Sequence, residues 1–117
     1  MKTDATAKIS EAAYLVYKDD TTEHALAVIE ANNHRSVVVV DANLVVVGML
    51  SDGDIRKLLL ERRLLSTPVQ HVMNPNFIAL RSSEQSRAKA LFERHPHILL
   101  LPVIDDRGRL LKILKAY

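Results

Sequence analysis

Short apolar runs and helix-patterned segments alternate along the chain. An apolar run at 14–17 (YLVY) is followed by a segment at 21–33 in which apolar residues recur at helical spacing. The β-branched runs at 36–41 (SVVVVD) and 44–50 predict two strands joined by a tight turn, and a second helix begins at Asp54. Because these runs have no polar face, we expect the strands to be buried on both sides and covered by helices.

The second half of the chain repeats this order. Three pairs of segments correspond, at offsets of 63, 63 and 64 residues: 14–17 with 77–80, 21–33 with 84–96, and 36–41 with 100–105. One extra residue in the loop around Pro96 accounts for the change of offset. A unit of strand, helix, strand, strand and helix, about 60 residues long, therefore occurs twice. Since one unit is too small for a good core, the pattern predicts a mixed α/β (α+β) domain with two sheets packed on each other.

The joint between the halves carries a helix-start signal and a stop signal. Thr67-Pro68 places an N-cap residue before a proline at the first helical position, and Asn74-Pro75 ends the short turn that follows. The sequence therefore predicts three parts: an N-terminal tail at 1–8, a first motif at 9–66 and a second motif at 67–117.

The most informative stretch chemically is 48–54 (GMLSDGD), where a buried strand leads into a helix. Gly48 lets another backbone or a ligand come close. The Ser51 hydroxyl and the first helical N–H groups face an incoming anion, and the Asp54 carboxylate can accept hydrogen bonds from a ribose diol. This layout predicts a site for an adenosine-type nucleotide. A purely structural interpretation stays open, because Ser51 and Asp54 also have the spacing of a capping box.

Other polar residues carry weaker signals. Arg56 and Lys57 could reach a polyphosphate, although basic residues on a helix are more often solvated. Only His95 and His97 among the histidines are close in sequence, and Pro96 between them does not suit a helical ligand pair, so we expect no metal site. The carboxylates lie mostly at predicted turns, and we expect no catalytic residue.

Composition narrows the class of protein. The chain has 117 residues, which suits one domain, and a net charge of +2, which is too small to suggest nucleic acid. Its 4% aromatic content argues against a protein that stacks aromatic side chains on single-stranded nucleic acid. The absence of cysteine excludes disulfides and thiolate metal sites. There is no apolar run of about 18–20 residues and no apolar signal-peptide core. We therefore expect a cytoplasmic protein with no membrane partner.

The repeat and the 48–54 stretch together resemble a tandem pair of cystathionine-β-synthase (CBS) motifs, or Bateman module, over nearly all of 9–117. The stretches DGDIRK and TPVQHVMNPN are most similar to CBS pairs attached to sugar-phosphate nucleotidyltransferases, while CBS pairs of sugar-phosphate isomerases have a similar DGD run. The resemblance implies two motifs, each a small β-sheet with two helices, packed as a pseudo-two-fold pair.

The resemblance also implies a regulatory ligand, such as AMP, ADP, ATP or S-adenosylmethionine, between the two motifs. Asp54 would hold the ribose hydroxyls and Ser51 the phosphate or ribose side. Tyr17 and Lys18 would line the adenine pocket, and the backbone around Val38 would read the base edge. The expected binding residues are Gly48, Ser51, Asp54, Arg56, Tyr17, Lys18 and Val38.

The second motif departs from this pattern. Lys112 stands where Gly48 stands, Lys115 stands where Ser51 stands, and the position of the ribose aspartate would follow Tyr117. We therefore expect an empty second nucleotide site, and a second motif that is truncated at its C-terminal end in a fragment of a larger protein.

We expect a regulatory module that reports nucleotide binding to an attached nucleotidyltransferase domain. We do not expect this chain itself to be an enzyme. A homodimer is expected because Ile55, Leu58 and Leu59 form an apolar helix face that one chain need not cover. Two alternatives stay open: a structural dimerisation module with a degenerate ligand site, and the regulatory CBS pair of a sugar-phosphate isomerase.

Overall fold

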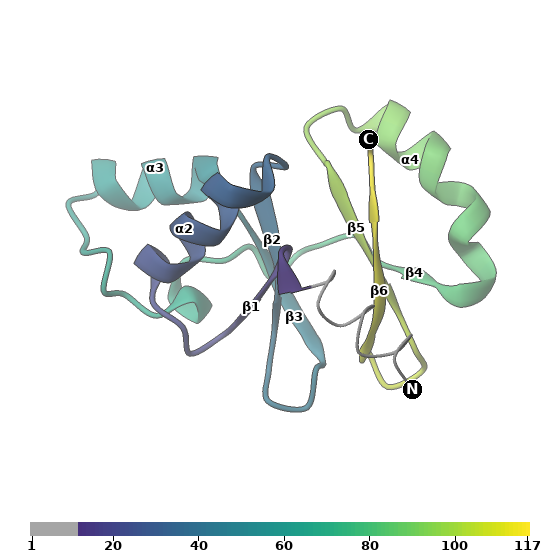
Figure 1. Ribbon diagram of the computed structural model, residues 1–117, viewed down its shortest axis with the longest axis horizontal. Helices are drawn as coiled ribbons and strands as arrows, with labels where there is room; N and C mark the ends of the chain where they lie inside the picture. The colour runs from purple at the N-terminus through teal and green to yellow at the C-terminus, as the bar shows by residue number, and fades with distance from the viewer. Residues whose placement is uncertain (1–11) are drawn as a thin grey trace.

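The computed structural model describes residues 12–117, so the predicted tail and the start of the first predicted motif lie outside the described residues. Two three-stranded sheets face each other, and the helices lie on their outer sides (Figure 1). The first repeat contains β1 (Leu15–Tyr17), α2 (Thr22–Asn32), β2 (Ser36–Val40), β3 (Val46–Ser51) and α3 (Asp52–Leu60). The second contains the 3-10 turn η1 (Val69–His71), β4 (Leu80–Arg81), the 3-10 turn η2 (Ser82–Arg87), α4 (Ala88–Arg94), β5 (Leu100–Ile104) and β6 (Leu110–Lys115).

Both sheets have the same topology. The middle strand pairs in parallel with the first strand and antiparallel with the last, in the orders β1-β2-β3 and β4-β5-β6. Val39 pairs with Gly48 just as Val103 pairs with Lys112, and an irregularity follows at the same point of each hairpin. The predicted α+β fold with two small sheets is therefore confirmed.

The pairing of the first strand in each repeat differs by one residue from the match predicted between the two halves of the sequence. Val16 lies opposite Val39 in the first sheet, and Leu80 lies opposite Val103 in the second. The two strands therefore correspond at an offset of 64, and the predicted match of 14–17 with 77–80 was wrong by one residue. These strands are only three and two residues long, so their apolar pattern was too short to fix the register.

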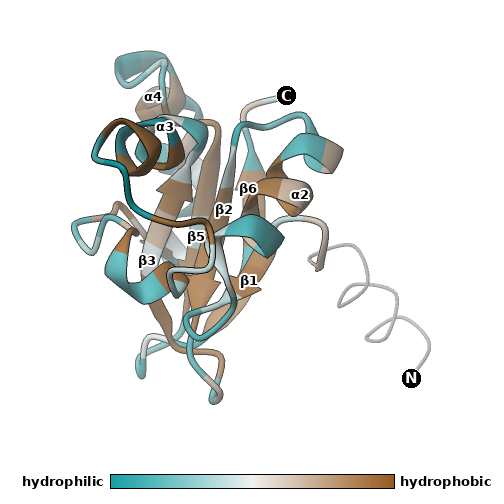
Figure 2. Ribbon diagram, turned by 90° about the vertical axis from the view of Figure 1, so that its left-hand side faces the viewer, coloured by the Kyte–Doolittle hydropathy of each residue, from teal (hydrophilic) through white to brown (hydrophobic). Residues whose placement is uncertain are grey.

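The middle strand β2 joins two hydrophobic cores. Val37 and Val39 point toward α2 and α3, where they pack with Ile29 and Ile55. Val38 and Val40 point the other way, into a core between the two sheets. That second core consists of Val38, Val40, Val46, Leu100 and Ile113. All four valines of β2 are fully buried, as predicted, and Figure 2 shows this strand in the hydrophobic interior.

The predicted helix start at the joint was wrong in detail. Pro68 itself, not Thr67, is the residue before η1, and no side chain caps this turn. The Thr67 hydroxyl instead donates a hydrogen bond of 2.6 Å to the Leu64 carbonyl. The proline ring fixes φ of Pro68 at −60°, with the extended backbone of a residue just ahead of a helical turn.

Gly48 lies where another part of the backbone crosses β3. A Cβ atom at this position would lie 2.6 Å from Sδ of Met73 and 3.0 Å from the Asn74 carbonyl oxygen. The neighbouring Met49 exchanges two backbone hydrogen bonds with Asn74, of 3.0 and 2.8 Å. Gly48 thus permits the joint between the repeats to pack directly on the first sheet.

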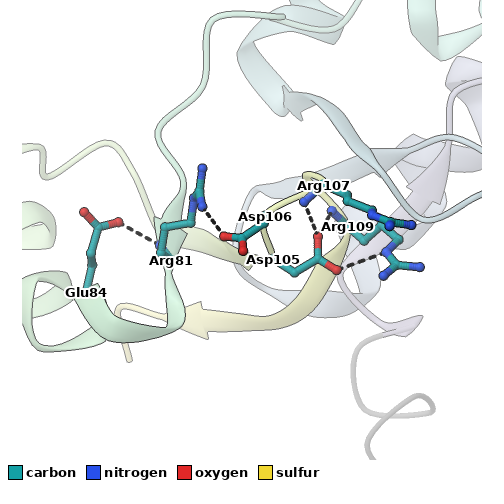
Figure 3. Close-up of polar contacts among 6 residues, drawn as sticks. All are labelled: Arg81, Glu84, Asp105, Asp106, Arg107 and Arg109. Atoms are coloured by element: carbon teal, nitrogen blue, oxygen red, sulfur yellow. Dashed lines mark hydrogen bonds and ion pairs between the residues drawn. The ribbon is translucent and has the colours of Figure 1, made fainter.

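The two hairpin turns are built alike and contact each other. Oδ1 of Asp105 accepts hydrogen bonds from the Arg107 and Arg109 backbone N–H groups at 2.8 and 2.9 Å, and the Arg109 Nε donates to Oδ2 at 3.0 Å (Figure 3). Asp41 accepts two backbone hydrogen bonds in the first turn in the same way. The pKa of Asp105 is lowered from its ordinary value of 3.8, chiefly because the Arg109 backbone N–H donates to its carboxylate. This hydrogen bond outweighs the opposing effect of burial.

These turns also join the repeats. The Val46 N–H donates to the Gly108 carbonyl at 2.9 Å, and the Leu110 N–H donates to the Leu44 carbonyl at 2.8 Å. The two sheets are therefore held together by backbone hydrogen bonds at their hairpin ends.

We expect Gly48→Ala to lower the free energy of unfolding by about 1–3 kcal/mol, because the added methyl group overpacks a filled position. Gly53→Ala is the matched control, since its Cβ would lie 3.6 Å from the nearest side-chain atoms, those of Arg56 and Ser51, and alanine favours helix. Urea unfolding followed by circular dichroism measures both variants. Equal stability of Gly48→Ala and the unmodified chain would contradict the packing role.

The Asp105→Asn variant should be less stable than the unmodified chain at neutral pH, and this difference should shrink in acid. The folded-state pKa lies below the unfolded one, so the stabilisation is present above about pH 4 and is lost as pH falls through the folded pKa. Urea unfolding at pH 7 and near pH 3 tests this, with the exposed Asp106→Asn as control. A pH-independent difference would count against the charge of Asp105 as the cause.

Candidate functional site

A cavity of about 450 Å³ opens between the two repeats. The first repeat contributes Ser36 at the start of β2, and the end of β3 with the first turn of α3. The second repeat contributes the segments around Phe77 and Leu99. Because β2 begins at Ser36 and runs toward its hairpin turn, the cavity lies at the end of the sheets opposite the tied turns. Its size is within the range of small-molecule sites.

Ser51 and Asp54 line this cavity and also hold each other in place. One carboxylate oxygen of Asp54 accepts hydrogen bonds from the backbone N–H and the hydroxyl of Ser51, at 2.9 and 3.0 Å. The Asp54 N–H donates in return to the Ser51 hydroxyl oxygen at 3.2 Å. The capping-box interpretation is therefore confirmed. Among residues 12–117, the other Asp54 carboxylate oxygen receives no hydrogen bond.

A second cavity, of about 430 Å³, adjoins the first and shares four lining residues with it: Ser36, Ser51, His97 and Leu99. Arg35 and the start of α3 form part of its own wall. The second cavity therefore combines the guanidinium group of Arg35 with the N-terminus of α3, a helix of nine residues. Both features attract anions.

Some residues that line these cavities could not be found from sequence patterns, because the second repeat and the Arg35 loop bring them there. Arg35, Phe77 and His97 belong to irregular segments between helices and strands, where single basic, aromatic or histidine residues carry no periodic signal. Arg35 has a left-handed backbone with φ of 59°. Such a conformation is uncommon for a residue other than glycine, and nothing in the local sequence predicts it.

Two of the other predicted binding residues lie at the opposite end of the first sheet. Tyr17 pairs with Val40 beside the hairpin turn, and its side chain is 45% exposed. Lys18 follows it and contacts Asp19 at 3.4 Å. Neither residue lines the two cavities described above, because the parallel pairing of β1 with β2 carries the end of β1 away from Ser36.

The remaining three predicted residues are also outside both cavities. The Val38 N–H donates to the Tyr14 carbonyl at 2.8 Å and its side chain is fully buried, so this backbone donor is already used. Arg56 is largely exposed and pairs with Asp52 at 3.5 Å, as expected for a solvated helix face. Gly48 packs against Met73, as described above.

The described part of the chain gives no sign of a metal centre or a membrane span. Among residues 12–117, no three His, Cys, Asp or Glu side chains gather closely enough to hold a metal ion. None of the helices there combines the length and apolar content needed to cross a bilayer.

Comparison with known proteins identifies the first repeat. Residues 5–61 match the family model of the CBS domain. The first repeat is therefore similar to a CBS domain. Over most of the chain, the fold matches that of solved proteins with CBS-domain pairs. One such match covers 87% of this chain and 75% of a putative signal-transduction protein with CBS domains from Burkholderia ambifaria, with a TM-score of 0.69 and 26% identity.

Two further solved CBS proteins contain bound ligands. CBSX2 in complex with AMP is 25% identical, with a TM-score of 0.68, and the match covers 86% of this chain and 79% of that one. The CBS-domain pair of MJ0100, in complex with 5'-methylthioadenosine and S-adenosyl-L-methionine, has a TM-score of 0.69 over 87% of this chain and 80% of that one. At 20% identity, this second likeness shows the fold alone.

Among curated proteins, the chain is similar to the arabinose 5-phosphate isomerase GutQ of Salmonella typhi, with 39% identity over 75 residues. This match covers 63% of the chain and 23% of the isomerase. An uncharacterized protein of Helicobacter pylori is 36% identical over 95 residues, which cover 78% of the chain and 29% of that protein. The chain therefore spans about a quarter of the length of these relatives.

Proposed function

We propose that this CBS pair, with motif boundaries at 9–66 and 67–117, is a regulatory module that binds an adenine nucleotide between its two repeats. The observation that carries the proposal is the Asp54 carboxylate at the cavity wall. Its Oδ2 is held by Ser51, while its other oxygen has no donor among residues 12–117. An oriented carboxylate with a spare acceptor suits the hydroxyl groups of a ribose.

The rest of the cavity suits the other parts of such a ligand. Met49, Phe77 and Ile78 offer apolar surface for a purine ring. In the adjoining cavity, Arg35 and the N-terminus of α3 would attract phosphate groups, while the acidic Asp52 of the same wall is paired with Arg56 at 3.5 Å. AMP bound to the related CBSX2 supports this class of ligand, and ADP, ATP and S-adenosylmethionine are the other candidates.

We propose that the module has no catalytic role of its own and reports nucleotide binding to a sugar-phosphate isomerase domain. The similarity to GutQ favours this partner. The nucleotidyltransferase partner expected from the sequence is supported only by the DGDIRK and TPVQHVMNPN stretches. Such control requires that the nucleotide bind more tightly to one state of the module than to the other.

The structural alternative also has an observation in its favour. The capping box by itself gives Ser51 and Asp54 a reason to be present, because such a cap stabilises the start of α3 without any ligand. Ligand binding and its dependence on Asp54 therefore separate the two functions.

Asp54→Ala should lower the affinity for AMP at least about tenfold, because each hydrogen bond to a charged group is worth about 1.5–3 kcal/mol and 1.4 kcal/mol is a factor of ten. It should also lower stability by about 0.5–2 kcal/mol through loss of the cap. Asp54→Asn keeps an acceptor oxygen for Ser51, so it should lose less stability while still losing affinity. Isothermal titration calorimetry measures the affinities and urea unfolding the stabilities.

Glu23→Ala removes an exposed acid from the first turn of α2, away from the cavity, and should leave the affinity unchanged. Failure of the unmodified chain to bind AMP at millimolar concentration, or full affinity in Asp54→Ala, would favour the structural module.

We expect one AMP site per chain. Lys112 takes the place of Gly48 in the equivalent register, where its ammonium group donates to Gln85 at 3.2 Å. Lys115 provides no hydroxyl in place of Ser51, so the second repeat lacks the serine that orients the Asp54 carboxylate in the first. The stoichiometry in the same titrations tests this expectation, and two equivalent sites would refute it.

We also propose a homodimer, through only part of the helix face expected from the sequence. Ile55 and Leu58 are 2% and 1% exposed because the chain's own core covers them. Leu59, Leu60 and Leu64 remain exposed at the end of α3 and in the following loop. Burying such leucines between two copies would stabilise a dimer.

Light scattering at high micromolar concentration should therefore give twice the chain mass of 13.1 kDa. Leu60→Asp should shift the mass toward the monomer, whereas Leu111→Asp, at an exposed leucine of the second repeat, should not. A monomeric mass for the unmodified chain would rule the dimer out.

A further inference from the structure

The loop between α2 and β2 brings Arg35 to the wall of the second cavity. Arg35 has a left-handed backbone, with φ of 59°, and this conformation is strained for a residue that carries a Cβ atom. Its side chain is exposed and forms no salt bridge with any residue in 12–117. Within the described chain, the strain is therefore not offset by a charged partner of the guanidinium group, and contacts of the neighbouring residues must hold the loop.

Asn32, the last residue of α2, supplies much of this support. Its side chain is buried, with 7% exposed. The amide nitrogen donates to the Ser36 carbonyl at 2.9 Å and to the Ala13 carbonyl at 3.1 Å. The amide oxygen accepts a hydrogen bond of 2.7 Å from the His34 N–H. Because residues 34 and 36 flank Arg35, one buried amide fixes the backbone on both sides of it.

The same loop is tied to α3. The Arg35 carbonyl accepts a hydrogen bond of 3.0 Å from the Asp52 N–H, in the first turn of that helix. Within the loop, the Ser36 hydroxyl donates to the His34 carbonyl at 3.1 Å. The backbone therefore has fixed contacts with both helices, while the guanidinium group is left available to a ligand. Such a loop loses little conformational entropy when a ligand binds.

The second repeat makes the equivalent connection without a buried amide. His95 takes the place of Asn32 at an offset of 63. It follows α4 with φ of −123°, and its carbonyl accepts a backbone hydrogen bond of 2.9 Å from Ile98. Joining a helix to the middle strand therefore does not by itself require such an asparagine. The first repeat has one where the loop also presents Arg35 to a cavity.

We propose that Asn32 is a positioning residue for the phosphate group of the nucleotide, because it holds the loop 33–36 so that the Arg35 guanidinium group meets the phosphate. This inference rests on the proposed function and assigns the preference for a nucleotide over a bare nucleoside to one buried amide that acts through Arg35. A guanidinium group can donate two parallel hydrogen bonds to a phosphate, and this geometry depends on its orientation. A fixed loop supplies that orientation before the ligand binds.

The test compares the affinities of AMP and adenosine for the full chain by isothermal titration calorimetry, because only AMP has the phosphate. Arg35→Asn should weaken AMP binding at least about tenfold and change adenosine binding by at most about twofold, since it removes only charge-assisted hydrogen bonds to the phosphate. Asparagine adopts the left-handed backbone more readily than arginine. This variant should therefore be at least as stable as the unmodified chain in urea unfolding.

Asn32→Ala should reduce the ratio of AMP affinity to adenosine affinity at least about fivefold, because Arg35 would no longer be held in place. The double variant Asn32→Ala with Arg35→Asn should lose little more than Arg35→Asn alone, since residues that act through one another have non-additive effects.

Thr22→Val is the matched control for a structural loss in the same helix. Thr22 is fully buried at the other end of α2, and its hydroxyl donates to the Thr67 carbonyl at 2.7 Å. Losing this buried hydrogen bond should lower stability, but it should leave the ratio of AMP affinity to adenosine affinity unchanged.

Because Asn32 is buried, a crystal structure of the unmodified chain with AMP gives a second test that needs no substitution. It should show the Asn32 hydrogen bonds intact and the Arg35 guanidinium group on the phosphate. An Arg35 side chain directed away from the phosphate would overturn the proposal. So would an unchanged affinity ratio in Asn32→Ala, additive losses in the double variant, or an Arg35→Asn variant that is less stable. If the unmodified chain binds neither AMP nor adenosine, the proposed function itself fails, and this inference fails with it.

Discussion

The structure depends on the burial of β2 on both of its faces. Val37 and Val39 contact the helix-side core, and Val38 and Val40 contact the core between the sheets. Because the side chains of a strand alternate, four consecutive valines can serve two cores at once. Loss of either core would expose half of this strand, so the first sheet, its helices and the second sheet are stabilised together.

The position of the cavity follows from where the two sheets are tied. Backbone hydrogen bonds link Val46 to Gly108 and Leu110 to Leu44, at the hairpin turns. At the other end, the sheets contact each other less closely and leave the space lined by Ser51 and Phe77. A ligand there would contact both repeats while the tied turns keep them aligned. Because the ties lie at the other end, a ligand that binds better to one spacing of the cavity walls would shift the module toward that state, as the proposed regulatory role requires.

At the cavity wall, the Asp54 carboxylate both caps α3 and is the group proposed to bind the ligand. The Ser51 cap fixes the Asp54 carboxylate before any ligand arrives, so little side-chain entropy is lost on binding. Such preorganisation explains how one short stretch can have both a capping and a ligand interpretation. The second repeat has no matching serine, because Lys115 stands in the place of Ser51 while the backbone register is retained.

The sequence by itself determined the repeat, the two sheets and the capping box. Each is encoded locally, in the β-branched runs of β2 and β3, in the helical spacing of α2, and in the Ser51–Asp54 spacing.

Tertiary structure decided which residues surround the cavity. Tyr17, Lys18 and Val38 were expected there, but strand direction and backbone pairing place them elsewhere, while Arg35, Phe77 and His97 are brought in by loops. Tertiary packing also buried Ile55 and Leu58 within the chain and gave Gly48 its role against Met73. Local spacing records the period of an element, but not which distant segment will pack against it.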